Sequence, residues 1–185
     1  MNKELDRQHI NRVLSGDNDA FRYFINTYQI MATRIAFSMV PDEVRAKHIV
    51  QNAYVQAFKS LRGFKQEAQF STWFYRIVVN EAIKINRRSK LEQRTVPISA
   101  DHTISLRTHN GALDALELKE KRKQINLALA AMKPKEGLML ELYYLQEYSI
   151  AEIKVITGFS ASNIKVLLYR ARKNFAAIFK SSNGV

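Results

Sequence analysis

The chain has 185 residues, and 46% of them are hydrophobic, which is enough for one large or two small globular cores. Its 29 Lys and Arg outweigh 17 Asp and Glu, and a net charge of +12 indicates a polyanionic partner, nucleic acid above all. The absence of cysteine excludes disulfides, thiolate zinc sites and a cysteine nucleophile. The sequence has neither a long apolar run nor the apolar centre of a signal peptide, so we expect a cytoplasmic protein without membrane insertion.

Apolar residues recur at spacings of three and four, which predicts helices, and only 6 Gly and 3 Pro interrupt them. A first short helix is expected at about 11–15. A second is expected from Asp19 to Val40, with one buried stripe of Phe21, Phe24, Tyr28, Ile35 and Met39.

Pro41 ends that helix and Asp42 is placed to cap the next one, over 43–64. The expected buried residues on or near one face of this third helix are Val44, Ile49, Ala53, Ala57 and Leu61. Gly63 is expected to end it.

The fourth helix is predicted over 70–88, with Ser71 or Thr72 as its cap. Phe74, Val78, Ala82 and Ile85 share the face expected to be buried. Another face carries Trp73, Arg76, Asn80, Lys84 and Arg87. An aromatic ring beside a track of cations is typical of proteins that hold unpaired nucleic acid. Trp73 taken alone is better explained as a core residue, and it is the combination with the preceding loop, "GFKQEAQ" at 63–69, that favours nucleic-acid binding.

The apolar pattern fails over 91–111, which we interpret as a flexible linker between domains. Helical patterns return over 112–132 and 135–146. The predicted fold is therefore all-α, with two small helical domains, 1–90 and 112–185, joined by the linker.

The C-terminal domain carries a helix-turn-helix pattern. Ser149 and Glu152 form a capping box before a short helix that ends at Thr157, Gly158 makes the turn, and Ser160 caps a longer basic helix from Ala161. The core face of that helix holds Ile164, Leu168, Ala171, Phe175 and Ile178. The opposite side offers groups suited to a DNA major groove: Ser162, Lys165, Val166, Tyr169, Arg170 and Lys173. The alternative is a solvated basic helix.

The order of parts resembles an extracytoplasmic-function (ECF) sigma factor of the bacterial sigma-70 family. The resemblance covers nearly the whole chain outside the linker. It is carried by "FSTWFYRIVVNEAIKINRR" at 70–88, "HIVQNAYVQAFKSLRGF" at 48–64 and "SIAEIKVITGFSASNIKVLLYRARKNF" at 149–175. It implies a sigma factor that binds core RNA polymerase and directs promoter-specific transcription initiation. The implied domains are region 2 at 1–90 and region 4 at 112–185.

The resemblance also implies three sets of contact residues. A loop and helix meeting the −10 element would use Phe64, Lys65, Gln66, Gln69, Trp73, Arg76, Asn80, Lys84, Arg87 and Arg88. The −35 duplex would meet Ser160, Ser162, Asn163, Lys165, Val166, Tyr169, Arg170 and Lys173. Core polymerase would meet His48, Gln51, Asn52 and Val55. An anti-sigma factor is implied as a further partner, with no cofactor and no metal.

The sequence departs from the family pattern at several of these positions. The acidic pair that usually precedes Gln51 is Lys47 and His48, and the acid that usually follows it is Asn52. Lys154 and Leu167 stand where the family usually has Ala and often Arg. These changes affect the expected polymerase contact and the promoter sequence, while the apolar pattern that sets the fold is kept.

Two other functions compete with a sigma factor. One is a regulator that binds duplex DNA as a dimer through the helix-turn-helix, with a helical sensor domain in front. It would not need the row from Trp73 to Arg88. The other is an enzyme acting on nucleic acid. We expect no enzyme, because the histidines (His9, His48, His102 and His109) are scattered and neither a carboxylate cluster nor a Gly-rich phosphate loop occurs.

Overall fold

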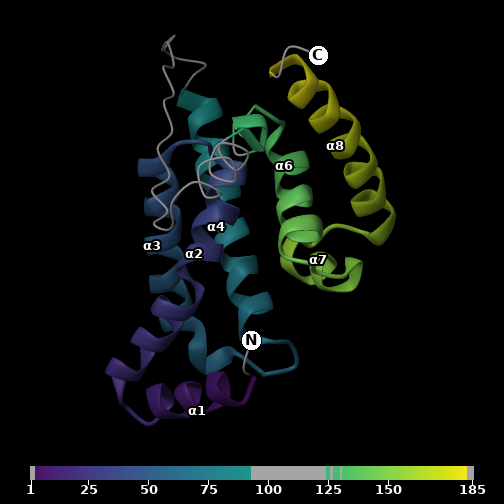
Figure 1. Cartoon of the computed structure of the whole chain (residues 1–185). Coiled ribbons are helices and arrows are strands. Elements are labelled where there is room, and N and C mark those ends of the chain that lie inside the picture. The colour runs from purple at the N-terminus through teal and green to yellow at the C-terminus, as the bar shows by residue number, and fades with distance from the viewer. Residues whose placement is uncertain (1–2, 93–123, 126, 130, 183–185) are drawn as a thin grey trace, which may run out of the picture.

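The computed structural model describes residues 3–92, 124–125, 127–129 and 131–182, which form helices joined by turns and short loops, with no β-strand among them (Figure 1). The elements are α1 (Lys3–Leu14), η1 (Asn18–Phe21), α2 (Arg22–Met39), α3 (Glu43–Ser60), η2 (Leu61–Gly63), α4 (Phe70–Glu92), α6 (Pro134–Leu140), η3 (Glu141–Leu145), α7 (Ile150–Thr157) and α8 (Ala161–Ser182). In this part of the chain no helix is long and apolar enough to cross a bilayer. The predicted linker, apart from the end of α4, lies outside the described residues, as does most of the helix predicted over 112–132.

Helix α1 begins at Lys3, so the prediction of a short helix at about 11–15 was wrong. Its inward face is formed by Asp6, Ile10 and Val13, at the i, i+4, i+7 spacing of one helix face. Because one of these three positions is a carboxylate, the apolar pattern does not reveal the first turns. Asp6 is buried, and its carboxylate accepts hydrogen bonds from the hydroxyls of Tyr28 (2.7 Å) and Tyr23 (3.0 Å).

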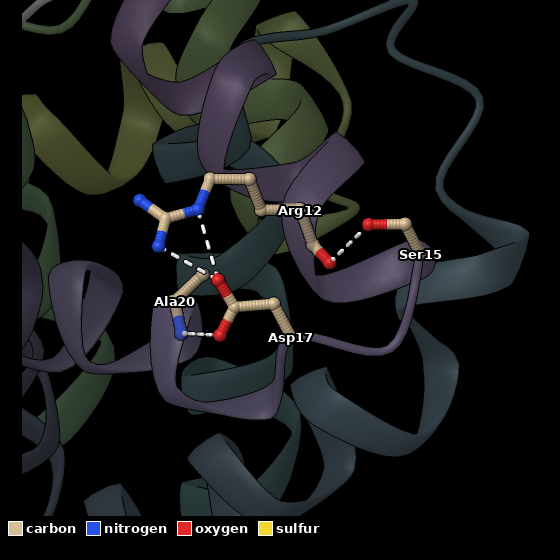
Figure 2. Close-up of polar contacts among 4 residues, drawn as sticks. All are labelled: Arg12, Ser15, Asp17 and Ala20. Atoms are coloured by element: carbon tan, nitrogen blue, oxygen red, sulfur yellow. Dashed lines mark hydrogen bonds and ion pairs between the residues drawn. The ribbon is translucent and has the colours of Figure 1, made fainter.

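The turn from α1 to α2 is fixed by Asp17, as Figure 2 shows. One carboxylate oxygen accepts from Nη2 (2.7 Å) and Nε (3.0 Å) of Arg12, and the other accepts from the Ala20 amide (3.2 Å). The hydrogen bonds from Arg12 hold the pKa of Asp17 below its usual value. Asp17 is therefore the N-cap of the 3₁₀ turn η1. The sequence predicted a helix from Asp19, whereas η1 occupies these positions and α2 begins at Arg22.

Helices α2, α3 and α4 form a bundle, and α1 crosses one end of it (Figure 1). The predicted stripe of α2 is confirmed, since Phe21, Phe24, Tyr28, Ile35 and Met39 are all buried. The cap of α3 is also confirmed, because Asp42 accepts from the Arg45 amide at 2.8 Å. Val44 was wrongly assigned to the core: it is 66% exposed.

Helix α4 begins at Phe70, so neither Ser71 nor Thr72 is its cap. Both are buried in the first turn, and the Trp73 amide donates to the Gln69 carbonyl at 3.1 Å. The predicted core face is otherwise correct: Phe74, Val78 and Ala82 are fully buried and Ile85 is half-buried. The ring of Phe74 stacks on Tyr54 of α3, with centroids 4.6 Å apart.

The C-terminal helices pack against this bundle, α6 on α2 and α7 on α4 (Figure 1). Pro134 starts α6, a position where its missing N–H is not needed. One continuous core runs through both domains, and the ring of Tyr148 lies edge-on to Tyr75 of α4 (6.3 Å between centroids). Gly137 permits close approach, because a Cβ there would lie 3.2 Å from the Ser38 carbonyl oxygen of α2.

Candidate nucleic-acid interface

The predicted cationic row of α4 lies on the surface. Arg76, Asn80, Lys84, Arg87 and Arg88 are all exposed. Lys84 pairs with Glu81, whereas the arginines of the row form no salt bridge with a carboxylate in the part of the chain that the structure describes. Because their charge is not neutralised locally, this side of α4 attracts an extended anion such as a nucleic-acid backbone.

Trp73 at the head of the row is half-buried and belongs to an aromatic cluster. Its ring packs against Phe64 (4.8 Å between centroids) and Phe70 (5.5 Å), and Phe64 meets Phe70 edge-on (6.0 Å). Trp73 is thus neither a fully exposed stacking platform nor a fully buried core residue. It supports the loop 64–69, in which Gln66 has a left-handed backbone with φ 57°. Such strain in a non-glycine residue persists only where the surroundings hold it.

The predicted helix-turn-helix is present in full. Ser149 Oγ accepts from the Glu152 amide, and the Glu152 carboxylate accepts from the Ser149 amide at 2.9 Å, which completes the capping box of α7. Gly158 ends α7 with φ 74°, a left-handed conformation that glycine adopts without strain. Ser160 Oγ accepts from the Asn163 amide at 3.3 Å at the start of α8.

Helix α8 presents the face expected to meet DNA. Ile164, Leu168 and Ala171 are buried, Phe175 and Ile178 are half-buried, and the residues predicted to contact the −35 duplex are exposed: Ser160, Ser162, Asn163, Lys165, Val166, Tyr169, Arg170 and Lys173. Tyr169 is 63% exposed, far more than a packed tyrosine would be. Leu167 stands where the family often has Arg. In this chain its side chain is half-buried against the core and contributes to packing.

A third surface lies on α3. His48, Gln51, Asn52 and Val55 are exposed on one side of the helix. Val44 belongs to the same side, since 44, 48, 51 and 55 follow helical spacing, and both valines are at least half exposed. Val44 was predicted to be buried because an apolar side chain at helical spacing is typical of a core position. Lys47 pairs with Glu43 at 2.7 Å, so the basic substitution is balanced within the helix.

The two histidines that the structure describes, His9 and His48, have different surroundings on different helices. His9 stacks on Tyr23 (4.0 Å between centroids), His48 is exposed on α3, and His102 and His109 lie outside the described residues. Among the side chains that the structure describes, no cluster of three or more His, Asp or Glu is arranged to hold a metal ion.

Comparison with known proteins gives two family matches that follow the two domains. Residues 24–92 match Sigma-70 region 2, and residues 122–175 match Sigma-70, region 4. The chain belongs to the sigma-70 family, in its ECF group. The region 2 match contains the α4 row and the exposed side of α3, and the region 4 match contains most of α8, so all three candidate surfaces fall inside family domains.

Curated relatives extend the similarity to most of the chain. The ECF RNA polymerase sigma factor SigW of Bacillus subtilis is 26% identical over 173 residues, covering 90% of this chain and 92% of its own. The ECF RNA polymerase sigma-E factor of Escherichia coli is 28% identical over 179 residues, covering 91% of each chain.

Solved structures show the same fold at lower identity. The sigma factor RpoE of Bartonella quintana, in complex with the anti-sigma factor NepR, superposes with a TM-score of 0.72 at 18% identity, over 86% of this chain and 96% of that one. CnrH, in complex with the cytosolic domain of CnrY, gives a TM-score of 0.64 at 19% identity, over 96% of this chain and 98% of that one.

Proposed function

We propose that this sigma factor binds core RNA polymerase through α3, reads the −35 duplex with α8 and holds the opened −10 strand with α4 and the loop before it. The observation that carries the proposal is the presence of two exposed cationic helix faces in one chain. A regulator of duplex DNA needs only the face on α8, whereas the row from Arg76 to Arg88 beside an aromatic loop suits an unpaired strand.

For the −10 element, the loop 64–69 is proposed to receive an extruded base and the α4 row to follow the backbone of the same strand. Extruding a base loses a few kcal/mol of stacking and pairing, which new contacts must offset. The rings of Phe64 and Trp73 offer apolar surface, and Lys65, Gln66 and Gln69 offer polar groups for the base edge. Arg87 and Arg88 supply charge at the far end of the row.

For the −35 element, the N-terminal half of α8 is proposed to enter the major groove. Lys165 and Arg170 supply cations for phosphates or guanine edges, and Val166 can contact a thymine methyl. The Tyr144 hydroxyl accepts from Arg172 at 3.1 Å, which ties α8 to η3 and fixes the angle at which the helix is presented. Leu167, turned to the core, is proposed not to take part in base reading.

For core polymerase, the side of α3 formed by Val44, His48, Gln51, Asn52 and Val55 is proposed as the contact. Relative to the family pattern this surface has lost acidic charge, and it displays two valines. We propose that apolar burial of the valines contributes more to this contact than ion pairs do.

The two DNA-reading helices must separate to work together. Elements named for positions −35 and −10 lie about 25 base pairs apart, or roughly 85 Å along B-form DNA. A compact chain of this length has a radius of gyration of about 16 Å. The packing of α7 on α4 and of α6 on α2 is therefore proposed to open when the factor joins polymerase and promoter.

Further parts of the proposal follow from the family. The chain acts in the cytoplasm as an initiation factor and not as an enzyme. An anti-sigma factor is proposed as a partner that holds the inactive form, because the relative from Bartonella quintana is described as bound to one.

Two charge variants test the proposal by separating its steps on holoenzyme. Reversing Arg87 and Arg88 to Glu should abolish strand opening, seen as loss of permanganate-reactive thymines, while −35 duplex binding persists. Alanine at Lys165 and Arg170 should weaken duplex binding and flatten its salt dependence by about one unit of slope per lost phosphate contact.

The matched control reverses Arg22 and Lys180, two exposed cations outside the three proposed surfaces. Unchanged melting temperatures would show that all variants fold. Normal strand opening by the Arg87 and Arg88 variant would refute the role of α4, and an unaltered salt slope in the other would assign −35 reading to a different face.

A further inference from the structure

A cavity of about 660 Å³ lies between α1 and the loop 64–70, and it is open to solvent on one side. Residues of α1 form one wall, including Lys3 and Arg7, and residues of the loop form the other, including Phe64 and Gln69. Binding pockets for small organic groups are typically about 300–1,000 Å³, so the cavity has room for a nucleotide. The family resemblance assigned a role to the loop but none to α1.

The loop wall offers what a nucleobase needs. Phe64 and Phe70 border it. The half-buried ring of Phe64 offers the apolar surface, and the ring of Phe70, which is 2% exposed, supports it edge-on from behind. The Gln66 and Gln69 side chains lie on the same wall and carry both donors and acceptors for a base edge.

The α1 wall offers what a phosphate needs. Lys3 and Arg7 are one helical turn apart, both are exposed, and neither forms a salt bridge within the described residues. Of the two carboxylates beside them, Asp6 is buried and already accepts from Tyr23 and Tyr28, and only Glu4 is exposed. A guanidinium in this place can bind a phosphate through two parallel hydrogen bonds.

We infer that the cavity holds one extruded nucleotide of the −10 strand between two walls, with its base against the loop and its flanking phosphate against Arg7 and Lys3 of α1. The inference rests on the proposed function and adds to it a positioning role for the N-terminal helix. The buried bonds of Asp6 to the two tyrosines keep α1 in place over α2, so the cations of α1 stay at the mouth of the cavity.

The test uses holoenzyme and a promoter fork whose non-template −10 strand carries a neutral methylphosphonate at one phosphate at a time. With the wild-type chain, one neutral linkage next to the extruded base should raise the Kd about 10-fold, the effect of losing one charge-assisted hydrogen bond. Arg7→Gln should raise the Kd by a similar factor on the natural strand. On the strand with that neutral linkage, the same substitution should cause almost no further increase in Kd. Such non-additivity identifies the phosphate that the side chain contacts.

Arg7→Lys should restore part of the affinity, since it keeps the charge and loses the planar fork. Arg22→Gln, which changes an exposed arginine outside the cavity, should leave the Kd unchanged. The inference would be overturned if Arg7→Gln left the Kd unchanged, or if it raised the Kd by the same factor at every position of the neutral linkage. Promoter binding by the wild-type holoenzyme would in that case still support the proposed function. Failure of the wild-type holoenzyme to bind the fork would refute both.

Discussion

Replacing Asp6 by Ala should destabilise the chain and release α1 from the bundle. Asp6 is 5% exposed. Within the described residues it forms no salt bridge, and its hydrogen-bond partners are the hydroxyls of Tyr23 and Tyr28. Burial and the bond to Asp6 both raise the pKa of Tyr28, so its hydroxyl stays a neutral donor at any ordinary pH. Alanine would leave both hydroxyls without this acceptor.

The magnitude follows from these bonds. A hydrogen bond to a charged group contributes about 1.5–3 kcal/mol, so two tyrosine donors contribute roughly 3–6 kcal/mol before the burial of the carboxylate is subtracted. We expect a net loss of about 3 kcal/mol for Asp6→Ala, or roughly 6–12 °C in Tm for a chain of this size. Asp6→Asn keeps one acceptor oxygen and should lose about 1 kcal/mol.

Urea and thermal unfolding followed by circular dichroism measure both effects. Asp19→Ala is the matched control, because within the described residues that carboxylate makes one exposed pair, with Arg22, and its loss should change the unfolding free energy by less than about 1 kcal/mol. If Asp6→Ala unfolded with the same free energy as the wild type, the tyrosine network would not be what holds α1 to the bundle.

Three further predictions concern the C-terminal half. Burial raises the pKa of Glu141, so the native state binds this proton more readily than the unfolded chain does. The free energy of unfolding therefore falls as pH rises from about 4.5 toward the raised pKa. Glu141→Gln should therefore melt above the wild type at neutral pH and lose that advantage in acid; a lower Tm at neutral pH would contradict the burial argument. Gly137→Val should cost about 1–3 kcal/mol in thermal unfolding, because its Cβ would press on the Ser38 carbonyl, and an equal or higher Tm would show that α6 can move away from α2 freely. Ser149→Ala breaks the capping box and should cost about 1 kcal/mol and weaken −35 binding, whereas an unchanged Tm would mean that α7 is set by packing alone.

Local signals in the sequence predicted the C-terminal half well. The capping box at Ser149, the left-handed turn at Gly158 and the two faces of α8 each depend on residues a few positions apart, so the pattern alone determines them. The same holds for Asp42 at the start of α3.

Errors arose where a residue's environment is set by distant parts of the chain. The start of α1 was not predicted because its inward face includes a carboxylate, Asp6. That carboxylate is buried because it accepts hydrogen bonds from two tyrosines of α2, which lie far away in the sequence. Ser71 and Thr72 are good capping residues by type, yet the packing of α4 buries them inside its first turn. Val44 fits an apolar stripe but lies on a surface that nothing in the described chain covers. The sequence also gave no sign that α6 and α7 would share one core with the N-terminal bundle, since no local pattern encodes a contact between segments so far apart.

The most direct test of the account is run-off transcription with purified core RNA polymerase on the DNA upstream of the chain's own gene. The account predicts a transcript with a defined start that requires this chain, and its start would also locate the −10 and −35 elements. Binding to duplex DNA with no affinity for core polymerase and no transcript would contradict the account and favour a helix-turn-helix regulator.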